Sequence, residues 1–399
     1  MVTQMKHLAQ RALDASIYPI TMFAIVALAG AALRGPTGTT LVGATSADSV
    51  ADGQRIFRFD TFGDEQFWTD TLHMNQVVEQ SVDPTTALTV GLKVDADVLP
   101  PGLLQTVDLK SPATTVALLK MNAVVGIQAT VDSSNHITRL GITCALCHST
   151  VDNSVMAGIG HRKDGWPNHD LNVGAIVALS PALSAAQRTV YQSWGPGRYD
   201  PRYNLDGKNG PLVIPPAYGL AHVKNETYTA EGPISYWNAY VAVTQMHGHG
   251  NFSDARLNIN VTQTPDMVGP KLAALRAYQH SLLAPPPPAG SFDVAAAQRG
   301  RGVFGRTCAS CHVGVSGTDN NAGKLHAPAE TGVDGAYAAR TATKAYRTTP
   351  LRALWQHAPY FHDGSAATLA DVVTHYNGAR KLKLTVAQQH DLVEYLKSF

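Results

Sequence analysis

The sequence is poor in charged residues, and the charges it has are balanced. Charged side chains make up 15% of the 399 residues, with 31 basic and 30 acidic residues, whereas soluble domains usually carry about 25%. The apolar fraction of 44% provides ample material for buried cores, which argues against a disordered chain. A formal net charge of +1 argues against a nucleic-acid-binding protein, which needs a strongly basic surface.

Cysteine is also scarce. The chain has four cysteines, at positions 144, 147, 308 and 311, which is too few for a disulfide-dense secreted scaffold. They form two C-x-x-C pairs and none is left over. At about 100–200 residues per domain, the length predicts two or three domains.

Long apolar runs are absent except for one, at residues 17–33, which follows Lys6 and Arg11 and ends before Arg34. A basic segment before an apolar one is typical of a signal peptide, and about 17 residues just suffice to span a bilayer. We expect residues 1–34 to be a signal peptide or an N-terminal membrane anchor, with cleavage favoured and a buried core helix as the alternative. Both favoured cases place the protein in the periplasm or another exported location.

The remaining chain divides at a run of four prolines. Residues 35–50 are rich in Gly, Thr, Ser and Ala and predict a linker. A first domain is expected over residues 51–284, a proline-rich linker over 285–290 and a second domain over 291–399. In the second domain, helical spacing predicts a helix over Phe292–Arg306 capped by Ser291, and another over Thr385–Phe399.

A weak internal echo relates the two domains. The segment Asp52–Phe57 resembles Gln298–Phe304, but Phe304 precedes Cys308 by four residues whereas Phe57 precedes Cys144 by 87. The insertion in the first domain is expected to hold a helix over Pro112–Asn122, capped by Ser111, and a β-hairpin. The hairpin strands are predicted over Val124–Val131 and His136–Ile142. The expected fold class is therefore mainly α, with an enlarged first domain.

Each cysteine pair is followed by histidine, in Cys144-Ala-Leu-Cys147-His148 and Cys308-Ala-Ser-Cys311-His312. C-x-x-C-H is typical of c-type haem attachment: two thiols bond the haem vinyl groups, and the histidine becomes the proximal iron ligand. A zinc ribbon needs two cysteine pairs about 15–20 residues apart, and the pairs at 144/147 and 308/311 are much farther apart than that. A thioredoxin-type redox pair needs a βαβ setting, which neither motif has. We therefore predict two covalently bound c-type haems.

A longer pattern follows in the second domain, over Arg347–Leu354, Ala358–Leu369 and Val372–Asn377. It resembles the C-terminal domain of the dihaem cytochrome c peroxidase and MauG-like family, with its T-P-x-L-R stretch, A-P-Y-x-H-D-G-S segment and following helix. The resemblance implies two cytochrome c-like haem domains. It also implies reduction of H2O2 at one haem with electrons relayed through the other, or oxidation of a partner as in MauG-like members.

The position of the family's distal ligand corresponds to Tyr376. No methionine follows Met267, so a histidine–methionine site, which raises the haem potential, lacks a local candidate. This departure favours the MauG-like reaction. The adjacent His375 is the alternative ligand, because about 100° of helical rotation lets only one of the two reach the iron. Ordinary packing is the simpler interpretation of both.

Further candidates come from the resemblance and from local composition. The resemblance implies a loop histidine after the first motif that can cap the first haem, and His161 is the candidate, with a surface loop histidine as the alternative. His247 and His249 lie among glycines and are candidate acids or bases, with a structural role as the alternative. A tryptophan relay between the haems is implied, with Trp166, Trp194, Trp237 and Trp355 as candidates and ordinary apolar packing as the alternative. Calcium is implied as well, and its candidate loop is Asp200, Asn204, Asp206 and Asn209. An ordinary turn explains that loop equally well.

These expectations define an exported dihaem enzyme whose reactive haem is held by the first domain. The implied partners are H2O2 or O2 and an electron-donor protein of the small cytochrome or cupredoxin type. Two alternatives remain open: an electron-transfer cytochrome without a substrate, and an oxygenase similar to the dihaem rubber oxygenases, which also have enlarged first domains.

Overall fold

The computed structural model describes residues 47–399. The signal peptide or anchor predicted at residues 1–34, with its apolar run at 17–33, and most of the linker predicted at 35–50 lie outside these residues. Within them, no helix has both the length and the apolar character needed to cross a membrane.

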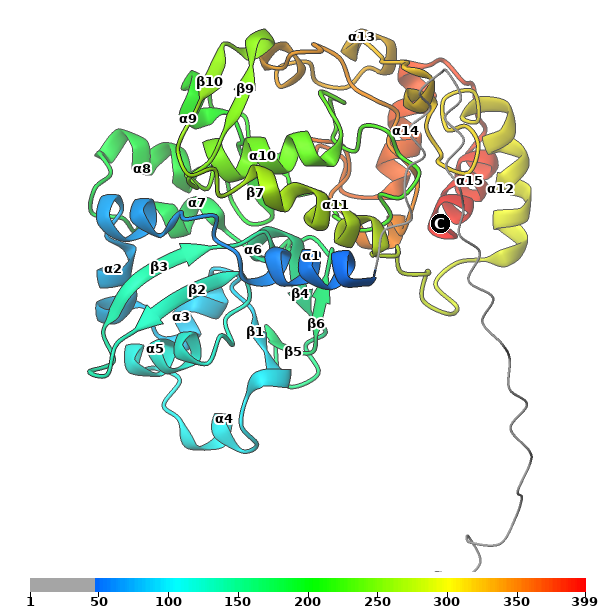
Figure 1. The fold of residues 1–399 in the computed structure, drawn as a ribbon. Helices are drawn as coiled ribbons and strands as arrows, with labels where there is room; N and C mark the ends of the chain where they lie inside the picture. Colours follow the sequence, from blue (N-terminus) through cyan, green and yellow to red (C-terminus); the bar gives the residue numbers. More distant parts are fainter. Residues whose placement is uncertain (1–46) are drawn as a thin grey trace, which may run out of the picture. The chain divides into compact units, whose positions relative to one another are not determined.

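The described chain is mainly helical, as predicted, and its strands form only two-stranded sheets (Figure 1). The helices are α1 (Ala47–Phe59), α2 (Met74–Ser81), α3 (Pro84–Thr89), α4 (Leu103–Thr106), α5 (Pro112–Lys120), α6 (Ala145–His148), α7 (Val173–Val177), α8 (Ala185–Gln192), α9 (Tyr203–Asp206), α10 (Ile234–Thr244), α11 (Leu272–Ser281), α12 (Val294–Thr307), α13 (Pro328–Thr331), α14 (Leu369–Ala379) and α15 (Val386–Lys397). The strand pairs are β1 (Val94–Asp95) with β5 (Ile159–Gly160), β2 (Ile127–Val131) with β3 (Ile137–Ile142), β4 (Ser149–Val151) with β6 (Arg162–Asp164), β7 (Arg198–Tyr199) with β8 (Leu212–Val213), and β9 (Phe252–Asp254) with β10 (Ile259–Val261).

Two helix pairs, α1 with α11 and α12 with α15, cross where a glycine of one helix lies against a backbone carbonyl of the other. In α1, a side-chain carbon on Gly53 would lie 2.0 Å from the carbonyl oxygen of Ala274 in α11, so the two helices cross too closely for any side chain there. In α12, a carbon on Gly300 would lie 1.9 Å from the carbonyl oxygen of Asp391 in α15. The backbones meet because glycine lacks a Cβ atom.

The same helix pairs share an aromatic contact four residues further on. Phe57 of α1 packs edge-to-face on Tyr278 of α11, with ring centroids 5.5 Å apart. Phe304 of α12 packs on Tyr395 of α15 at 5.2 Å. The echo between Asp52–Phe57 and Gln298–Phe304 therefore marks equivalent contacts in two helix pairs.

The insertion between α1 and the first C-x-x-C-H motif has the predicted elements. Helix α5 begins at Pro112, as expected, but the side chain of Ser111 makes no capping bond. Strands β2 and β3 form the antiparallel hairpin, and both begin later than predicted. The Asp132 carboxylate closes the turn by accepting from the backbone N–H groups of Ser134 and His136.

The caps in the second half require one correction. Ser291 is not the N-cap of α12: the helix begins two residues after the predicted Phe292, and Asp293 accepts from the N–H groups of Ala295 and Ala296. Thr385 caps α15 as expected, in a capping box with Gln388. Residues 285–290, predicted as a linker, contain no helix or strand.

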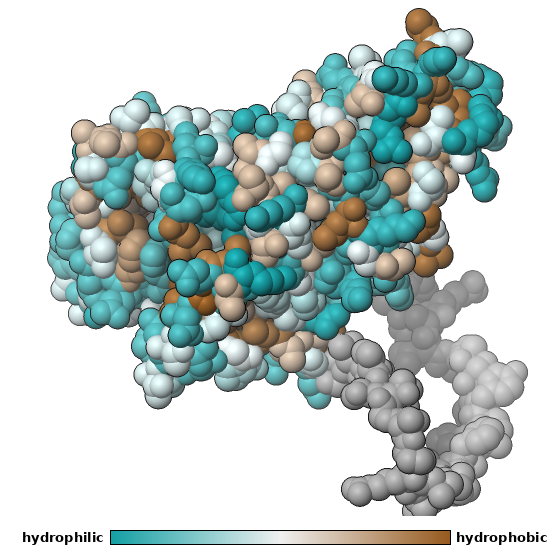
Figure 2. Space-filling view, turned by 90° about the horizontal axis from the view of Figure 1, so that it is seen from above, coloured by the Kyte–Doolittle hydropathy of each residue, from teal (hydrophilic) through white to brown (hydrophobic). Residues whose placement is uncertain are grey.

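Three of the four apolar clusters in the described chain hold the helices and the insertion together. The insertion packs around Trp68, Leu119 and Leu140. A second cluster joins α1, α10 and α11 through Phe57, Tyr240 and Leu275. A third joins α12, α14 and α15 through Phe304, Val373 and Leu392. On the face shown in Figure 2, hydrophobic residues emerge as patches within a mostly hydrophilic surface.

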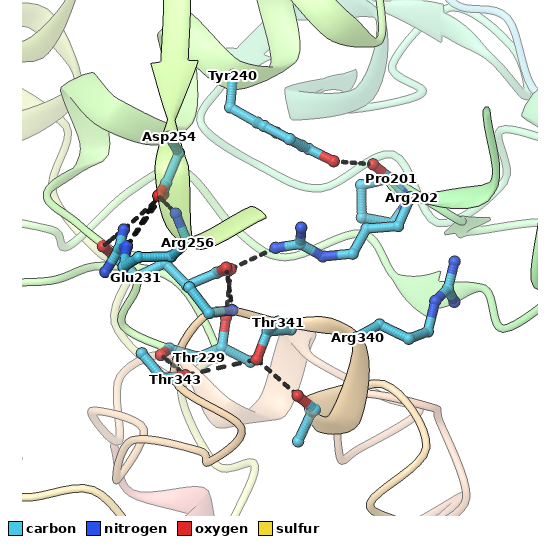
Figure 3. Close-up of polar contacts among 12 residues, drawn as sticks. Pro201, Arg202, Thr229, Glu231, Tyr240, Asp254, Arg256, Arg340, Thr341 and Thr343 are labelled. Carbon is cyan, nitrogen blue, oxygen red and sulfur yellow. Dashed lines mark hydrogen bonds and ion pairs between the residues drawn. The ribbon is translucent and has the colours of Figure 1, made fainter. Parts of the chain in front are cut away.

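A buried ion pair before the proline run is joined by hydrogen bonds to the segment after it (Figure 3). The guanidinium of Arg202 donates to the fully buried carboxylate of Glu231. The other Glu231 oxygen accepts from the backbone N–H of Ala342 at 2.9 Å. Thr343 donates to the carbonyl oxygen of Thr229 at 2.8 Å. The segment around residue 342 is thereby fixed against the first half of the chain.

Candidate haem site

Both C-x-x-C-H motifs line one cavity of about 870 Å³, although the chain separates them widely. Its wall includes Cys144, Cys147, His148, Cys308, Cys311 and His312. Most of the remaining lining is apolar, from the insertion at one end and from α12, α14 and α15 at the other.

The first motif follows strand β3 and forms the short helix α6. The Thr143 hydroxyl donates to the carbonyl oxygen of Arg58 at 3.1 Å, which ties the motif to the end of α1. Gly126 lies against the backbone of Leu146, where a side-chain carbon would lie 2.1 Å from the nitrogen. The helical turn closes through the N–H of His148, which donates to the carbonyl oxygen of Cys144 at 3.2 Å.

The second motif begins where α12 ends, with Cys308 at the C-cap position. Its turn closes in the same way, because the N–H of His312 donates to the carbonyl oxygen of Cys308 at 3.1 Å. The ring of Phe304 lies 6.0 Å from that of His312. The glycine and phenylalanine of the α12–α15 contact thus lie directly before the motif.

The two motif histidines present the same nitrogen to the cavity. Nδ1 of His148 lies 3.0 Å from the carbonyl oxygen of Pro215, and Nδ1 of His312 lies 3.3 Å from that of Gly317. A carbonyl oxygen only accepts, so each Nδ1 carries the proton and each Nε2 keeps its lone pair. Burial lowers the pKa of both histidines to about 4, which keeps them in the neutral form that binds iron.

The cysteines also suit covalent haem attachment. All four are unpaired, and burial raises the pKa of Cys144 and Cys147 to about 12 and that of Cys308 above its ordinary value. A buried thiol of this kind is a poor nucleophile or metal ligand, whereas a thioether carries no charge into the apolar wall. Thiols, neutral imidazoles and apolar lining together fit covalently bound haem c.

The structure separates the two candidate distal ligands on α14. Tyr376 lines the cavity, and burial raises its pKa to about 12. His375 is outside the cavity lining, and its Nε2 donates to the carbonyl oxygen of Thr331 at 2.8 Å. Tyr376 therefore has the more favourable position, and its role as a ligand stays a prediction.

The candidate histidines proposed around the first haem, His161, His247 and His249, occupy different places. His247 lines the cavity and stacks on Phe67 with ring centroids 3.7 Å apart, and desolvation lowers its pKa. His161 is exposed, outside the cavity lining, and its Nδ1 lies 2.6 Å from the Asp97 carboxylate. His249 is also outside the lining, and its buried Nε2 has no partner. Only His247 of the three reaches the cavity.

Two hydrogen bonds of lining residues were not predicted from the sequence. His362 shares a buried hydrogen bond of 2.9 Å with the Tyr346 hydroxyl. Tyr199 donates to the Oε1 of Gln245 at 2.8 Å near the first motif. These partners are far apart along the chain, so no local pattern relates them.

The tryptophans considered for a relay divide into two groups. Trp194 and Trp237 line the cavity. Trp166 and Trp355 lie outside the lining and pack edge-to-face on each other, with ring centroids 5.7 Å apart.

Both carboxylates of the loop considered for calcium are already bound by one arginine. The Arg340 guanidinium donates to both carboxylate oxygens of Asp200, at 3.0 Å each, and to both of Asp206, at 2.7 and 2.9 Å. Asn204 and Asn209 bond Thr244 and Ser193 through their side-chain amides. A protein cation thus occupies these carboxylates, and calcium stays a prediction without support from this loop.

Comparison with known proteins identifies part of the chain. Residues 297–399 match the cytochrome c family, so the C-terminal part is a cytochrome c domain, whose cofactor is covalently bound haem c. No curated protein matches the chain.

Two solved structures resemble it only distantly. The first is hydrazine synthase of Kuenenia stuttgartiensis, at 20% identity, with 48% of this chain and 73% of that chain covered and a TM-score of 0.33. The second is a MauG-like protein associated with microbial copper homeostasis, at 23% identity and a TM-score of 0.26. That match covers 32% of this chain and 55% of the MauG-like chain.

Proposed function

We propose that the protein is an exported dihaem c-type cytochrome that reduces H2O2, or oxidises a partner in the MauG-like manner, at one haem with electrons relayed through the other. The observation that carries this proposal is that both C-x-x-C-H motifs line the same cavity. The matching glycine and aromatic contacts of α1–α11 and α12–α15 support a second cytochrome c-like unit in the first half.

The roles of the chain's own residues follow from their positions. His148 and His312 would hold the haem irons through Nε2, and the haems, when bound, would supply the electron transfer. Reduction of H2O2 consumes two electrons and two protons and yields two waters, so a group that moves protons is required. His247 is suited to this because its lowered pKa leaves it able to accept a proton at neutral pH. The mostly apolar lining would lower the polarity around a bound haem.

The remaining parts of the proposal concern the setting of the protein. Export agrees with the C-terminal domain, because c-type cytochromes are usually exported. The electrons are proposed to come from a small cytochrome or cupredoxin. The first-domain haem is proposed as the reactive one because the insertion, Phe67 and His247 enclose that end of the cavity.

The test is to add H2O2 to the fully reduced and half-reduced protein while recording the Soret band. A spectral change and turnover with a reduced donor protein support a peroxidase. Oxidation of a protein partner without net donor turnover supports the MauG-like reaction. No spectral change leaves an electron carrier, and O2 uptake with an organic substrate identifies an oxygenase.

A further inference from the structure

Two arginines of one short segment face the cavity without an acidic partner. Arg347 and Arg352 flank the Thr-Thr-Pro-Leu sequence, and both line the cavity wall. Among the described residues, every hydrogen bond of these two guanidinium groups goes to a backbone carbonyl oxygen. Neither guanidinium therefore forms a salt bridge with an acid of the described chain, although the Glu226 carboxylate lies close enough to Arg347 to act on its charge.

Arg347 is held rigidly. Its Nε donates to the carbonyl oxygen of Thr227 at 2.6 Å, its Nη2 to that of Glu226 at 2.8 Å and its Nη1 to that of Thr348 at 3.2 Å. A guanidinium has five N–H groups, so two remain after these bonds. Arg352 makes one bond, to the carbonyl oxygen of Ala221 at 3.2 Å, and most of its donors remain for a ligand.

Both charges are costly in the empty cavity. Burial and, to a smaller extent, the nearby charge of Arg352 lower the pKa of Arg347 to about 10, against the opposing effects of Tyr228 and Glu226. Burial lowers the pKa of Arg352 as well. Both stay protonated at neutral pH, so two like charges face an apolar space, an arrangement that is unfavourable unless an anion joins them.

The acids of the same wall are already occupied. Asp200 is bound by Arg340. Glu226 is bound by the ring of His280 at 2.9 Å and by the backbone N–H of Ile234 at 2.7 Å. The third arginine of the lining, Arg380, is exposed and donates to the carbonyl oxygen of Glu330. The excess positive charge is therefore concentrated on Arg347 and Arg352.

We infer that Arg347 and Arg352 bind carboxylate groups, and that these are the propionate side chains of haem in this cavity. Haem c is attached through its vinyl groups, which leaves its two propionates ionised and in need of cations. The planar fork of arginine matches a carboxylate and is stronger than a neutral donor. The assignment requires bound haem but does not require any reaction with peroxide.

Loss of the positive charge of an arginine beside the propionates is expected to change the reduction potential of the haem. A cation beside the propionates stabilises the reduced iron, which carries less positive charge, and it keeps the propionates ionised. Removing the cation is therefore expected to lower the midpoint potential and to raise the pH at which the potential becomes pH-dependent. Lysine at the same position keeps the charge and is expected to retain most of the potential.

The experiment is potentiometric titration of the holoprotein between pH 5 and 8 for wild type, Arg352→Gln and Arg352→Lys. Arg139→Gln is the control, since Arg139 is exposed and pairs only with Asp70. The inference expects a lower potential and a shifted pH dependence in Arg352→Gln alone. It is overturned if Arg352→Gln carries its haems and titrates like wild type. It is also overturned if the wild-type potential shifts when acetate is added and that of Arg352→Gln does not, because the pair then binds a soluble carboxylate.

Discussion

Gly300 lies with its α-carbon against the backbone carbonyl of Asp391, where α12 crosses α15 in the cytochrome c domain. The side-chain carbon of an alanine at this position would lie 1.9 Å from that oxygen. The two helices would have to move apart to make room for this carbon. Their separation would disturb the third apolar cluster and the second haem motif, which depend on these helices.

Gly300→Ala is therefore expected to destabilise the holoprotein by at least about 1–3 kcal/mol, the usual range for overpacking. Gly305→Ala is the matched control in the same helix, because nothing lies within 4 Å of a carbon placed there. Alanine is the better helix former by about 1 kcal/mol, so this variant is expected to be more stable. Denaturant unfolding measures both; equal effects would contradict the close crossing.

Glu231→Gln tests the buried ion pair with Arg202. Removing one charge leaves the other buried and unpaired, which usually costs about 3–5 kcal/mol. Asp70→Asn breaks an ion pair with Arg139 that is about half exposed, at 52% and 51% of the two side chains, and is expected to cost about 0–1 kcal/mol. The free energy of unfolding of both variants is measured by denaturant titration. Equal losses of stability would show that the buried ion pair contributes no more than the exposed one.

Stability is expected to depend on pH through Asp64. Burial, with Glu65 nearby, raises its pKa to about 9 from 3.8. A carboxyl whose pKa is higher in the folded state favours folding while protonated, and its contribution is lost as pH rises toward the folded value. Asp64→Asn removes this penalty, so the melting temperature of the variant should gain on wild type between pH 5 and pH 8. A constant difference across that range argues for an ionised Asp64.

Haem attachment predicts the state of the cysteines. Whole-protein mass is expected to show two haems, and no thiol should react with iodoacetamide after denaturation. In Cys308→Ala, one thioether is lost at the second motif, and the reduced pyridine haemochrome band should shift for one haem of the two. A free thiol in the wild-type holoprotein would contradict the assignment.

His247 and His161 provide a matched pair for the proposed peroxide reaction. Loss of a group that moves protons usually lowers kcat by about 10²–10⁴-fold, and His247→Ala is expected to fall in that range. Wild-type activity should decline as pH falls through the lowered pKa of His247, because its proton-accepting form disappears. His161→Ala should leave kcat unchanged, since that side chain pairs with Asp97 outside the cavity lining.

Local sequence patterns predicted much of this protein. The helix at α5, the hairpin of β2 and β3 and the cap at Thr385 depend on residues close together in the chain, and the structure has all three. Ser291 was the wrong cap because Asp293, two residues on, bonds the first free N–H groups of α12. Possible N-cap residues within one turn of each other differ too little in capping free energy for a sequence pattern to identify the one that is used.

The cavity could be predicted only in part. The C-x-x-C-H motifs are local signals, but their meeting in one cavity depends on the whole fold. The position of Tyr376 relative to His375 depends on which face of α14 meets the neighbouring segments. That Arg347 and Arg352 form no salt bridge within the described chain is equally unpredictable from the sequence, because the acids of the wall are bound by residues far away along the chain.

The two glycine crossings also differ in how much chain they enclose. Gly53 meets Ala274, whereas Gly300 meets Asp391, so the first loop is more than twice as long as the second. The added closure entropy is small, about 0.8 kcal/mol, but contacts distant in sequence slow folding strongly. We expect the C-terminal domain to fold first, and the first helix pair to close last, after the long insertion has collapsed around its haem motif.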